Sequence, residues 1–178
     1  LSAAQNIMDG RVEIDQDLIS DFDTEIRPGL LDLKEKVEKA AKQKQKAEQA
    51  DLFNELKVKM DDAAENPEDI GGMQLVSCVF PDAGMQVLRK AASYLEKRSP
   101  SSVVILAGSD GSKAYLVCAV PGETAKKGIT AKELVNQAAK KINGSGGGKE
   151  NFAQAGGDNP GGLKDAVSEV KRIMEEKG

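Results

Sequence analysis

Histidine and tryptophan are both absent from this 178-residue sequence, which has only four Phe and two Tyr. The lack of histidine excludes Ser-His-Asp and Cys-His catalytic arrangements, imidazole general bases and the histidine-containing sites of most catalytic zinc and iron. Two cysteines are too few for a four-thiolate zinc site. The scarcity of aromatic rings also limits any base-stacking surface. The composition therefore favours a binding or assembly module over an enzyme.

Both cysteines, Cys78 and Cys118, occur in the apolar runs MQLVSCVF and AYLVCAV. We expect them to be buried as small hydrophobic side chains in a reducing compartment, with a disulfide as the minor alternative. No run of about 18 apolar residues predicts a membrane span. The first residues lack a signal-peptide pattern and an initiator Met, which indicates a piece of a longer chain. We expect a cytoplasmic protein, or an organellar copy.

The composition changes near Asn66. Residues 1–66 hold ten Lys or Arg against sixteen Asp or Glu, whereas residues 67–178 hold fifteen basic and thirteen acidic residues and sixteen of the eighteen Gly. This change predicts two domains: a helical, coiled-coil-prone subdomain over 1–66 and an α/β globular domain over 67–178, with a Gly-rich loop at 144–162.

Apolar residues at four-residue steps predict a helix near the N-terminus: Ile14, Leu18, Phe22 and Ile26. Arg27-Pro28-Gly29 interrupts the pattern. Beyond it, apolar residues alternate at spacings of three and four as in a coiled-coil seam, and the pattern resumes with a shift: Leu30, Leu33, Val37, Leu52, Leu56 and Met60. Two interpretations remain open, a helical hairpin closed on itself and a seam that pairs with a second chain to form a homodimer.

Strand and helix signals alternate in the second part. We predict strands at 73–80, 101–110 and 113–121. Helices are expected from Asp82 to about Lys97, from Thr130 to Ile142 with Glu133 in a capping box, and from Leu163 to Lys177. Because the strands are apolar almost throughout, the sequence predicts an α+β or α/β fold, with a mixed sheet covered by helices.

Eight glycines lie in the nineteen positions 144–162. One interpretation is a flexible surface loop, in which Phe152, Ala153 and Ala155 can form a short strand. The other, which we favour, is a loop that exposes backbone N–H groups beside Lys149 for phosphate oxygens. The P-loop motif is excluded because Lys149 is followed by Glu150, and the dinucleotide motif is excluded because Lys149 stands where its third Gly is needed.

The charge around this segment also favours a polyanion. Residues 126–164 contain seven lysines and three acidic residues, in a chain of net charge −4. The alternative is an ordinary solvated helix face. We favour RNA or DNA phosphates as the partner. Four other cations extend the patch or solvate the earlier helix: Arg89, Lys90, Lys97 and Arg98.

The segment GGGKENFAQAGG at 146–157 resembles the glycine-rich signature near the C-terminus of alanyl-tRNA synthetases. The order of parts is also similar: a helical segment, an α/β globule, this loop and a closing helix. The globule is similar, too, to the domain that accompanies DHH phosphoesterases. There the triple glycine is typically followed by His and helps bind the phosphate or carboxylate of the substrate. Lys149 takes that place here, so the resemblance does not extend to hydrolysis.

The resemblance implies a non-catalytic C-terminal domain of an ATP-dependent alanine–tRNA ligase. Such a domain binds the outer corner of tRNA, helps couple aminoacylation with editing and often dimerises through its helices. ATP, magnesium and zinc are expected only in upstream domains, and no cofactor, metal site or catalytic residue is expected here. The alternative is a dimerisation or protein- or DNA-interaction appendage with negligible tRNA affinity.

By this resemblance the RNA-facing residues are the motif positions Gly146, Gly147, Gly148, Lys149, Gln154, Gly156 and Gly157. The glycines would allow close backbone approach, Lys149 would meet phosphate, and Gln154 would hydrogen-bond a base edge or ribose. A tightly packed strand that supports the loop is the alternative for 153–157. The neighbouring lysines complete the expected surface: Lys126, Lys127, Lys140 and Lys141.

Overall fold

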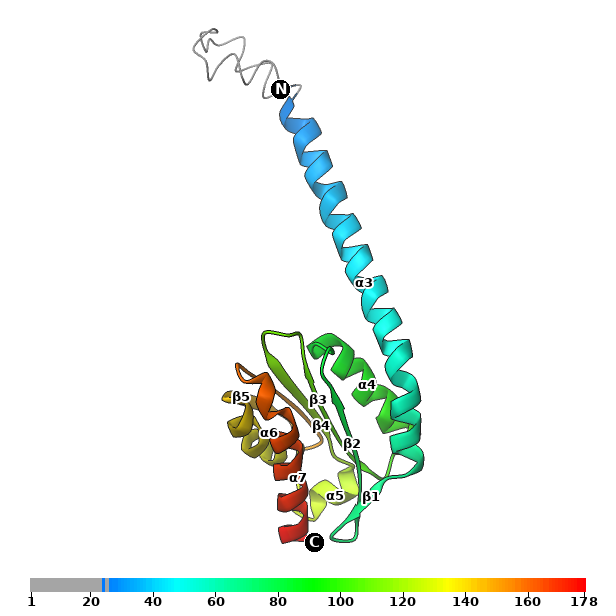
Figure 1. The fold of residues 1–178 in the computed structure, drawn as a ribbon, viewed down its shortest axis with the longest axis vertical. Helices are drawn as coiled ribbons and strands as arrows, with labels where there is room; N and C mark the ends of the chain where they lie inside the picture. The colour runs from blue at the N-terminus through cyan, green and yellow to red at the C-terminus, as the bar shows by residue number, and fades with distance from the viewer. Residues whose placement is uncertain (1–23, 25) are drawn as a thin grey trace. The chain divides into compact units, whose positions relative to one another are not determined.

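The computed structural model describes residue 24 and residues 26–178. Contacts divide the chain into two compact units, residues 1–48 and residues 49–178. The predicted helical positions Ile14, Leu18 and Phe22 lie outside the described residues. One long helix, α3 (Arg27–Glu65), contains the division point (Figure 1). Arg27-Pro28-Gly29 begins this helix, because a proline in the first turn removes no intrahelical hydrogen bond.

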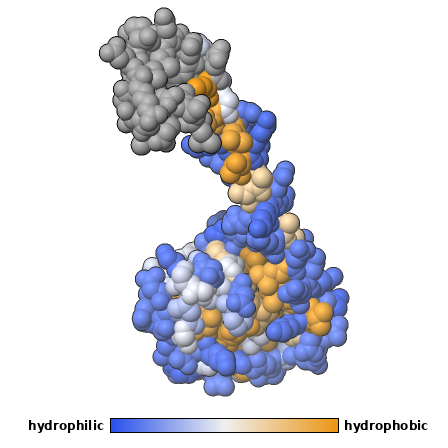
Figure 2. Space-filling model, turned by 45° about the horizontal axis from the view of Figure 1, so that its top comes forward, coloured by the Kyte–Doolittle hydropathy of each residue, from blue (hydrophilic) through white to orange (hydrophobic). Residues whose placement is uncertain are grey.

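In the first unit, the described part of α3 is a solvent-exposed helix. Ion pairs one turn apart support it, among them Lys36 with Asp32 and Lys39 with Glu35, both at 2.7 Å. Several large apolar side chains are nevertheless 48–60% exposed: Ile26, Leu30, Leu31, Leu33 and Val37. Figure 2 shows the resulting hydrophobic surface on this part of the helix.

The second unit is built on a six-stranded mixed sheet in the order β1-β2-β3-β4-β6-β5. Only β2 and β3 are parallel, and α4 (Met85–Arg98) connects them; all other neighbours are antiparallel. The strands are β1 (Glu68–Ile70), β2 (Met73–Phe80), β3 (Val103–Ser109), β4 (Ala114–Ala119), β5 (Gly144–Gly148) and β6 (Phe152–Gly157).

Helices cover both faces of this sheet (Figure 1). On one face, α6 (Ala131–Ala139) and α7 (Leu163–Lys177) pack on side chains such as Ile105 and Leu116. On the other, α4 and the last part of α3 pack on Leu106 and Val117. Every residue of β3 is buried, because alternate side chains enter opposite cores. The predicted mixed sheet between helices is therefore confirmed.

The second half of the expected coiled-coil seam packs within the chain. Met60 is fully buried, and Leu52 and Leu56 are partly buried in the same core with Leu88 of α4. These three positions therefore have an intramolecular partner, and the assignment of Met60 to a dimer seam is corrected. The same packing explains why the compact unit begins at Gln49, whereas the change in composition falls at the end of α3.

Several local predictions are confirmed and others are corrected. The strand at 73–80 and the final helix occur as expected, and the Oγ1 of Thr130 accepts a hydrogen bond from the Glu133 amide as the predicted cap. The Glu133 carboxylate instead pairs with Lys177 at 2.6 Å. Helix α4 begins at Met85 rather than Asp82, because a turn follows β2.

Three short helical segments lie between the longer elements of the second unit. These are α5 (Gly122–Lys126), the 3₁₀ turn η2 (Lys140–Ile142) that ends the predicted helix, and the 3₁₀ turn η3 (Pro160–Gly162). None of the helices that the structure describes is long and apolar enough for a membrane span.

Both cysteines are free and buried, as predicted. Cys78 belongs to the α4 side of the sheet and Cys118 to the α6–α7 side, so the sheet separates the two thiols. Burial raises the pKa of Cys78 to about 11 and raises the pKa of Cys118 still further. Both side chains therefore act as small core hydrophobes.

Candidate nucleic-acid interface

The glycine-rich segment is a β-hairpin at the edge of the sheet rather than an open loop. Strand β5 (Gly144–Gly148) pairs antiparallel with β6, and β5 is the outermost strand. The predicted short strand around Phe152, Ala153 and Ala155 is confirmed as part of β6. Glycine has a low strand propensity, so the reason for so many glycines lies in what surrounds them.

Close packing explains most of these glycines. A Cβ on Gly146 would lie 2.7 Å from Val135 Cγ1 and from the Ala155 Cβ, because α6 lies directly on β5. A Cβ on Gly157 would lie 2.1 Å from the Ile142 carbonyl oxygen, so this buried residue does not face a ligand. Gly147 differs, since a Cβ there would meet nothing within 4 Å. The packed-strand alternative for 153–157 therefore holds at Gly157, close packing also accounts for Gly146, and Gly147 faces open space.

The hairpin pairing decides which backbone groups are available to a ligand. The Lys149 N–H donates to the Phe152 carbonyl oxygen at 2.8 Å, so it is not free for phosphate. Hydrogen-bonded pairs alternate along an antiparallel ladder, so Gly146 and Gly148 direct their N–H and C=O groups towards the open edge. The exposed backbone N–H groups that we expected beside Lys149 are therefore those along this open edge of β5.

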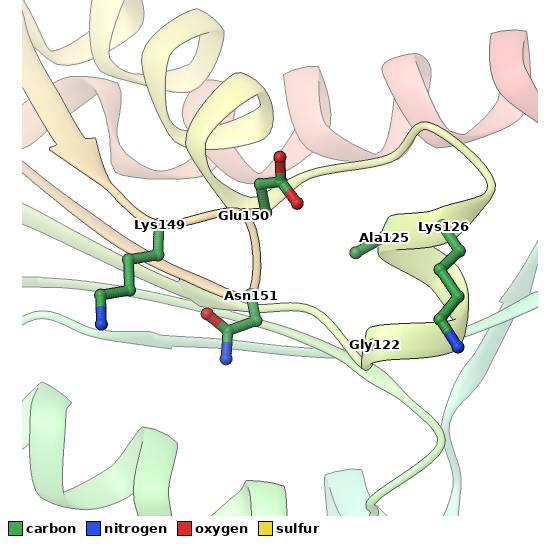
Figure 3. A pocket seen from close by; sticks show the side chains of 6 residues that line it. All are labelled: Gly122, Ala125, Lys126, Lys149, Glu150 and Asn151. Atoms are coloured by element: carbon green, nitrogen blue, oxygen red, sulfur yellow. The ribbon is translucent and has the colours of Figure 1, made fainter.

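The turn that joins β5 to β6 is anchored at two carbonyls. The Glu150 oxygen accepts a hydrogen bond from the Ala131 amide at 2.7 Å, and the Asn151 oxygen accepts one from the Val120 amide at 2.9 Å. The side chains of Lys149 and Asn151 point to one side of the turn and that of Glu150 to the other (Figure 3). The backbone therefore holds the exposed Lys149 in a defined place.

An open pocket of about 590 Å³ lies beside this turn (Figure 3). Its lining combines two cations with neutral and acidic groups: Gly122, Ala125, Lys126, Lys149, Glu150 and Asn151. The Lys126 ammonium is already 2.9 Å from Glu123, so Lys149 is the cation here with the greater capacity for a new anion.

Gln154 has a partner that the sequence did not predict. Its Oε1 accepts a hydrogen bond of 2.7 Å from Nε of Arg89 on α4. The two remaining guanidinium nitrogens of Arg89 and the amide of Gln154 are left to meet a ligand. A second open pocket of about 370 Å³ adjoins Gln154, and three of the residues that line it are glycines: Met85, Ser145, Gly146, Gly147, Gln154, Ala155 and Gly156.

The other predicted lysines do not gather around Lys149. Lys140 donates to Gln137 Oε1 at 2.7 Å, and Lys141 lies 3.6 Å from a carboxylate oxygen of Glu169. Both precede β5, whereas Lys149 follows it, and five strand residues span about 16 Å at roughly 3.3 Å each. Lys127 lies at the C-cap of α5. Of the predicted cations, only Lys126 shares a pocket with Lys149.

Residues 24 and 26–178 contain no group of three or more His, Cys, Asp or Glu side chains that could hold a metal ion. What the hairpin offers is cations, an amide and exposed backbone, which suit phosphate and ribose groups.

Residues 72–176 match the DHHA1 domain, and the chain belongs to this family of α/β domains. Among its relatives are alanine–tRNA ligases. The ligase of Pediococcus pentosaceus is 38% identical over 107 residues, covering 60% of this chain and 12% of the relative. That of Lactobacillus gasseri is 36% identical over 132 residues, covering 74% and 14%. The chain thus spans only 12–14% of the length of these relatives.

The fold is likewise similar to that of a solved piece of such an enzyme. The C-Ala domain of Aquifex aeolicus alanyl-tRNA synthetase is 33% identical, with a TM-score of 0.57, and the match covers 62% of this chain and 98% of that domain. RecJ of Thermus thermophilus shares the fold alone, with 14% identity and a TM-score of 0.52 over 73% of this chain and 17% of RecJ.

Proposed function

We propose that this chain is the C-terminal, non-catalytic part of an alanine–tRNA ligase and that it binds tRNA. The likeness to nearly the whole C-Ala domain, at 33% identity, is the observation that carries this proposal. In the complete ligase, this part binds the outer corner of tRNA and helps bring the aminoacylation and editing centres onto one tRNA. The chemistry that needs ATP, magnesium and zinc belongs to other parts of that ligase, which acts in the cytoplasm.

The hairpin supports this proposal through its exposed groups. Lys149 meets a phosphate, Gln154 hydrogen-bonds a ribose or base edge, and the open edge at Gly146 and Gly148 admits a backbone at close range. Gly147 and Gly156 leave room beside them. With four Phe and two Tyr in the whole sequence, binding relies on shape and on phosphate contacts more than on stacking. Lys126, Lys140 and Lys141 contribute less, because each already has a polar partner.

Titration of labelled tRNA-Ala over a series of salt concentrations tests the proposal. We expect affinity to fall steeply with salt, and Lys149→Glu to weaken binding and reduce the slope of log Kd against log salt by about one. Lys164→Glu is the matched control, since this exposed lysine lies in the first turn of α7, where an acidic residue suits the helix dipole. Absence of tRNA binding even at low salt would refute the proposal.

A comparison with duplex DNA at matched ionic strength addresses the alternative partner. Tighter binding of DNA than of tRNA would favour the interaction-appendage alternative over the tRNA-binding one.

A second candidate function is homodimerisation through α3. Leu30, Leu33 and Val37 are 54–60% exposed at coiled-coil spacing, an unusual exposure for large apolar side chains. The occupant that fits this spacing is the same helix of a second copy. Sedimentation of the whole chain beside Leu33→Glu tests it, because a charge in the seam should dissociate the dimer. A monomeric wild-type chain at high concentration would exclude it.

A further inference from the structure

We infer that the exposed face of α4 is a second contact surface for the tRNA phosphate backbone, an inference that rests on the proposed function. The residues concerned are spaced so that they lie along one side of the helix, and all are exposed: Gln86, Arg89, Lys90, Ser93 and Lys97, here called the α4 stripe. Three are cations and none is acidic. The lysines predicted as the basic patch occur elsewhere, at α5, η2 and the β5–β6 turn.

The α4 stripe, on a single helix, borders a shallow and open groove. Together with Tyr94 it surrounds an open space of about 420 Å³. The end of α3 supplies neighbouring cations and rings: Lys57 Nζ lies 5.7 Å from the Tyr94 ring centre, and Lys90 Nζ lies 5.9 Å from that of Phe53. Contact with an aromatic face attracts a lysine head group, so these cations are held near the groove before a ligand arrives.

Among the residues that the structure describes, no carboxylate forms an ion pair with any of the three cations of the α4 stripe. Asp61 accepts a hydrogen bond from the Tyr94 hydroxyl at 2.5 Å and lies 3.5 Å from Nε of Arg98. Arg98 also pairs with Glu65 at 3.0 Å. Glu96 lines a different pocket, with Pro121 and Asn151. The positive charge of the α4 stripe is therefore not cancelled locally, and a polyanion is the complementary partner.

The α4 stripe is continuous with the hairpin surface through one hydrogen bond. Arg89 belongs to the stripe and donates to Gln154 of β6. From Gln86 to Lys97 the helix advances about 16 Å at roughly 1.5 Å per residue, a length that reaches more than one phosphate. A protein partner is disfavoured because the groove has no apolar anchor, and its one ring bears a hydroxyl that is already bonded.

Charge reversal in pairs tests this surface. Lys90→Glu with Lys97→Glu is compared with Lys59→Glu with Lys164→Glu, which makes the same change of charge at exposed positions of α3 and α7 that line neither surface. In tRNA titrations we expect the α4 pair to raise Kd roughly tenfold and to lower the salt slope by about 1.5, since each phosphate contact contributes about 0.7–0.9. The control pair should leave both nearly unchanged.

A measurement on the wild-type chain avoids any effect of substitution on folding. Acetylation of surface lysines with and without tRNA, read by mass spectrometry, should show protection of Lys90 and Lys97 but not of Lys59 and Lys164. Equal effects of the two charge-reversal pairs, or no protection at α4, would overturn the inference. If the wild-type chain still binds tRNA in that case and Lys149→Glu weakens it, the proposed function stands without the α4 surface. If the wild-type chain binds no tRNA at all, both the proposed function and the α4 surface are refuted.

Discussion

The Nε of Arg89 donates a hydrogen bond of 2.7 Å to Oε1 of Gln154, and this contact joins α4 to β6 across 65 positions of the sequence. Both side chains reach solvent, so the bond adds little to stability. It does fix the direction of a guanidinium and of an amide on one surface. Fixed donors lose less conformational entropy when they bind a ligand.

A double-mutant cycle measures this relationship. We expect Arg89→Ala and Gln154→Ala each to destabilise the fold by less than about 1 kcal/mol, since exposed polar pairs contribute little. In tRNA titrations the two substitutions should be non-additive, because either one frees the partner from its fixed orientation. Strictly additive effects on Kd would show that the two side chains act independently.

Two adjacent glycines of β5 should respond oppositely to the same substitution. Gly146→Ala places a methyl group 2.7 Å from Val135 and Ala155, and such overpacking costs about 1–3 kcal/mol or more. Gly147→Ala meets no atom within 4 Å and should leave the free energy of unfolding within about 1 kcal/mol of the wild type. Urea unfolding of both variants checks this. Equal destabilisation would mean that α6 does not hold β5 as closely as described.

Substitutions in the two halves of the expected helical seam should have different effects on the free energy of unfolding. Met60→Ala empties a fully buried site and should destabilise the folded unit by about 2–5 kcal/mol. Leu33→Ala removes a side chain that is 57% exposed, so the unfolding of the globular unit should not change. Chemical denaturation followed by circular dichroism distinguishes the two, and a large effect of Leu33→Ala at low protein concentration would indicate a further intramolecular partner for α3.

Periodicity explains why part of the fold was predictable. Residues 73–80 form an apolar run and residues 163–177 have a strong amphipathic repeat, so β2 and α7 were located from the sequence. The short elements β1 and α5 contain too few residues to show a period. The seam was misassigned at Met60 because spacing of three and four is the same whether a helix packs on its own sheet or on a second chain.

The candidate site was only partly predictable for a related reason. The glycine motif drew attention to Lys149 and Gln154, but glycine does not indicate a strand, and the close approach of α6 that requires Gly146 is a tertiary contact. The pairing of Arg89 with Gln154 is likewise long-range. Counting lysines between 126 and 164 did not show that Lys141 pairs with Glu169, since ion pairs depend on which faces meet.

The acid stability of the fold should depend on the turn between β3 and β4. The Asp110 carboxylate accepts hydrogen bonds from the Tyr115 hydroxyl at 2.6 Å and from the Lys113 and Ser112 amides at 2.9 and 3.1 Å. These bonds, with that of Tyr115 the largest cause, hold the pKa of Asp110 well below its ordinary value. The stabilisation is therefore complete above the unfolded-state pKa and is lost as pH falls from there towards the lower folded-state pKa.

Tyr115→Phe removes the largest cause and should raise the pKa of Asp110 towards its ordinary value. The variant should then lose less stability than the wild type between pH 7 and pH 3, and Asp110→Asn should remove this contribution altogether. Urea midpoints at the two pH values, with a carboxyl NMR titration of Asp110, measure both effects. Glu68 and Glu169 also have lowered pKa values through their ion pairs, but they contribute equally in all three proteins, so the difference isolates Asp110. An unchanged acid dependence in Asp110→Asn would show that the turn does not hold the carboxylate in its ionised form.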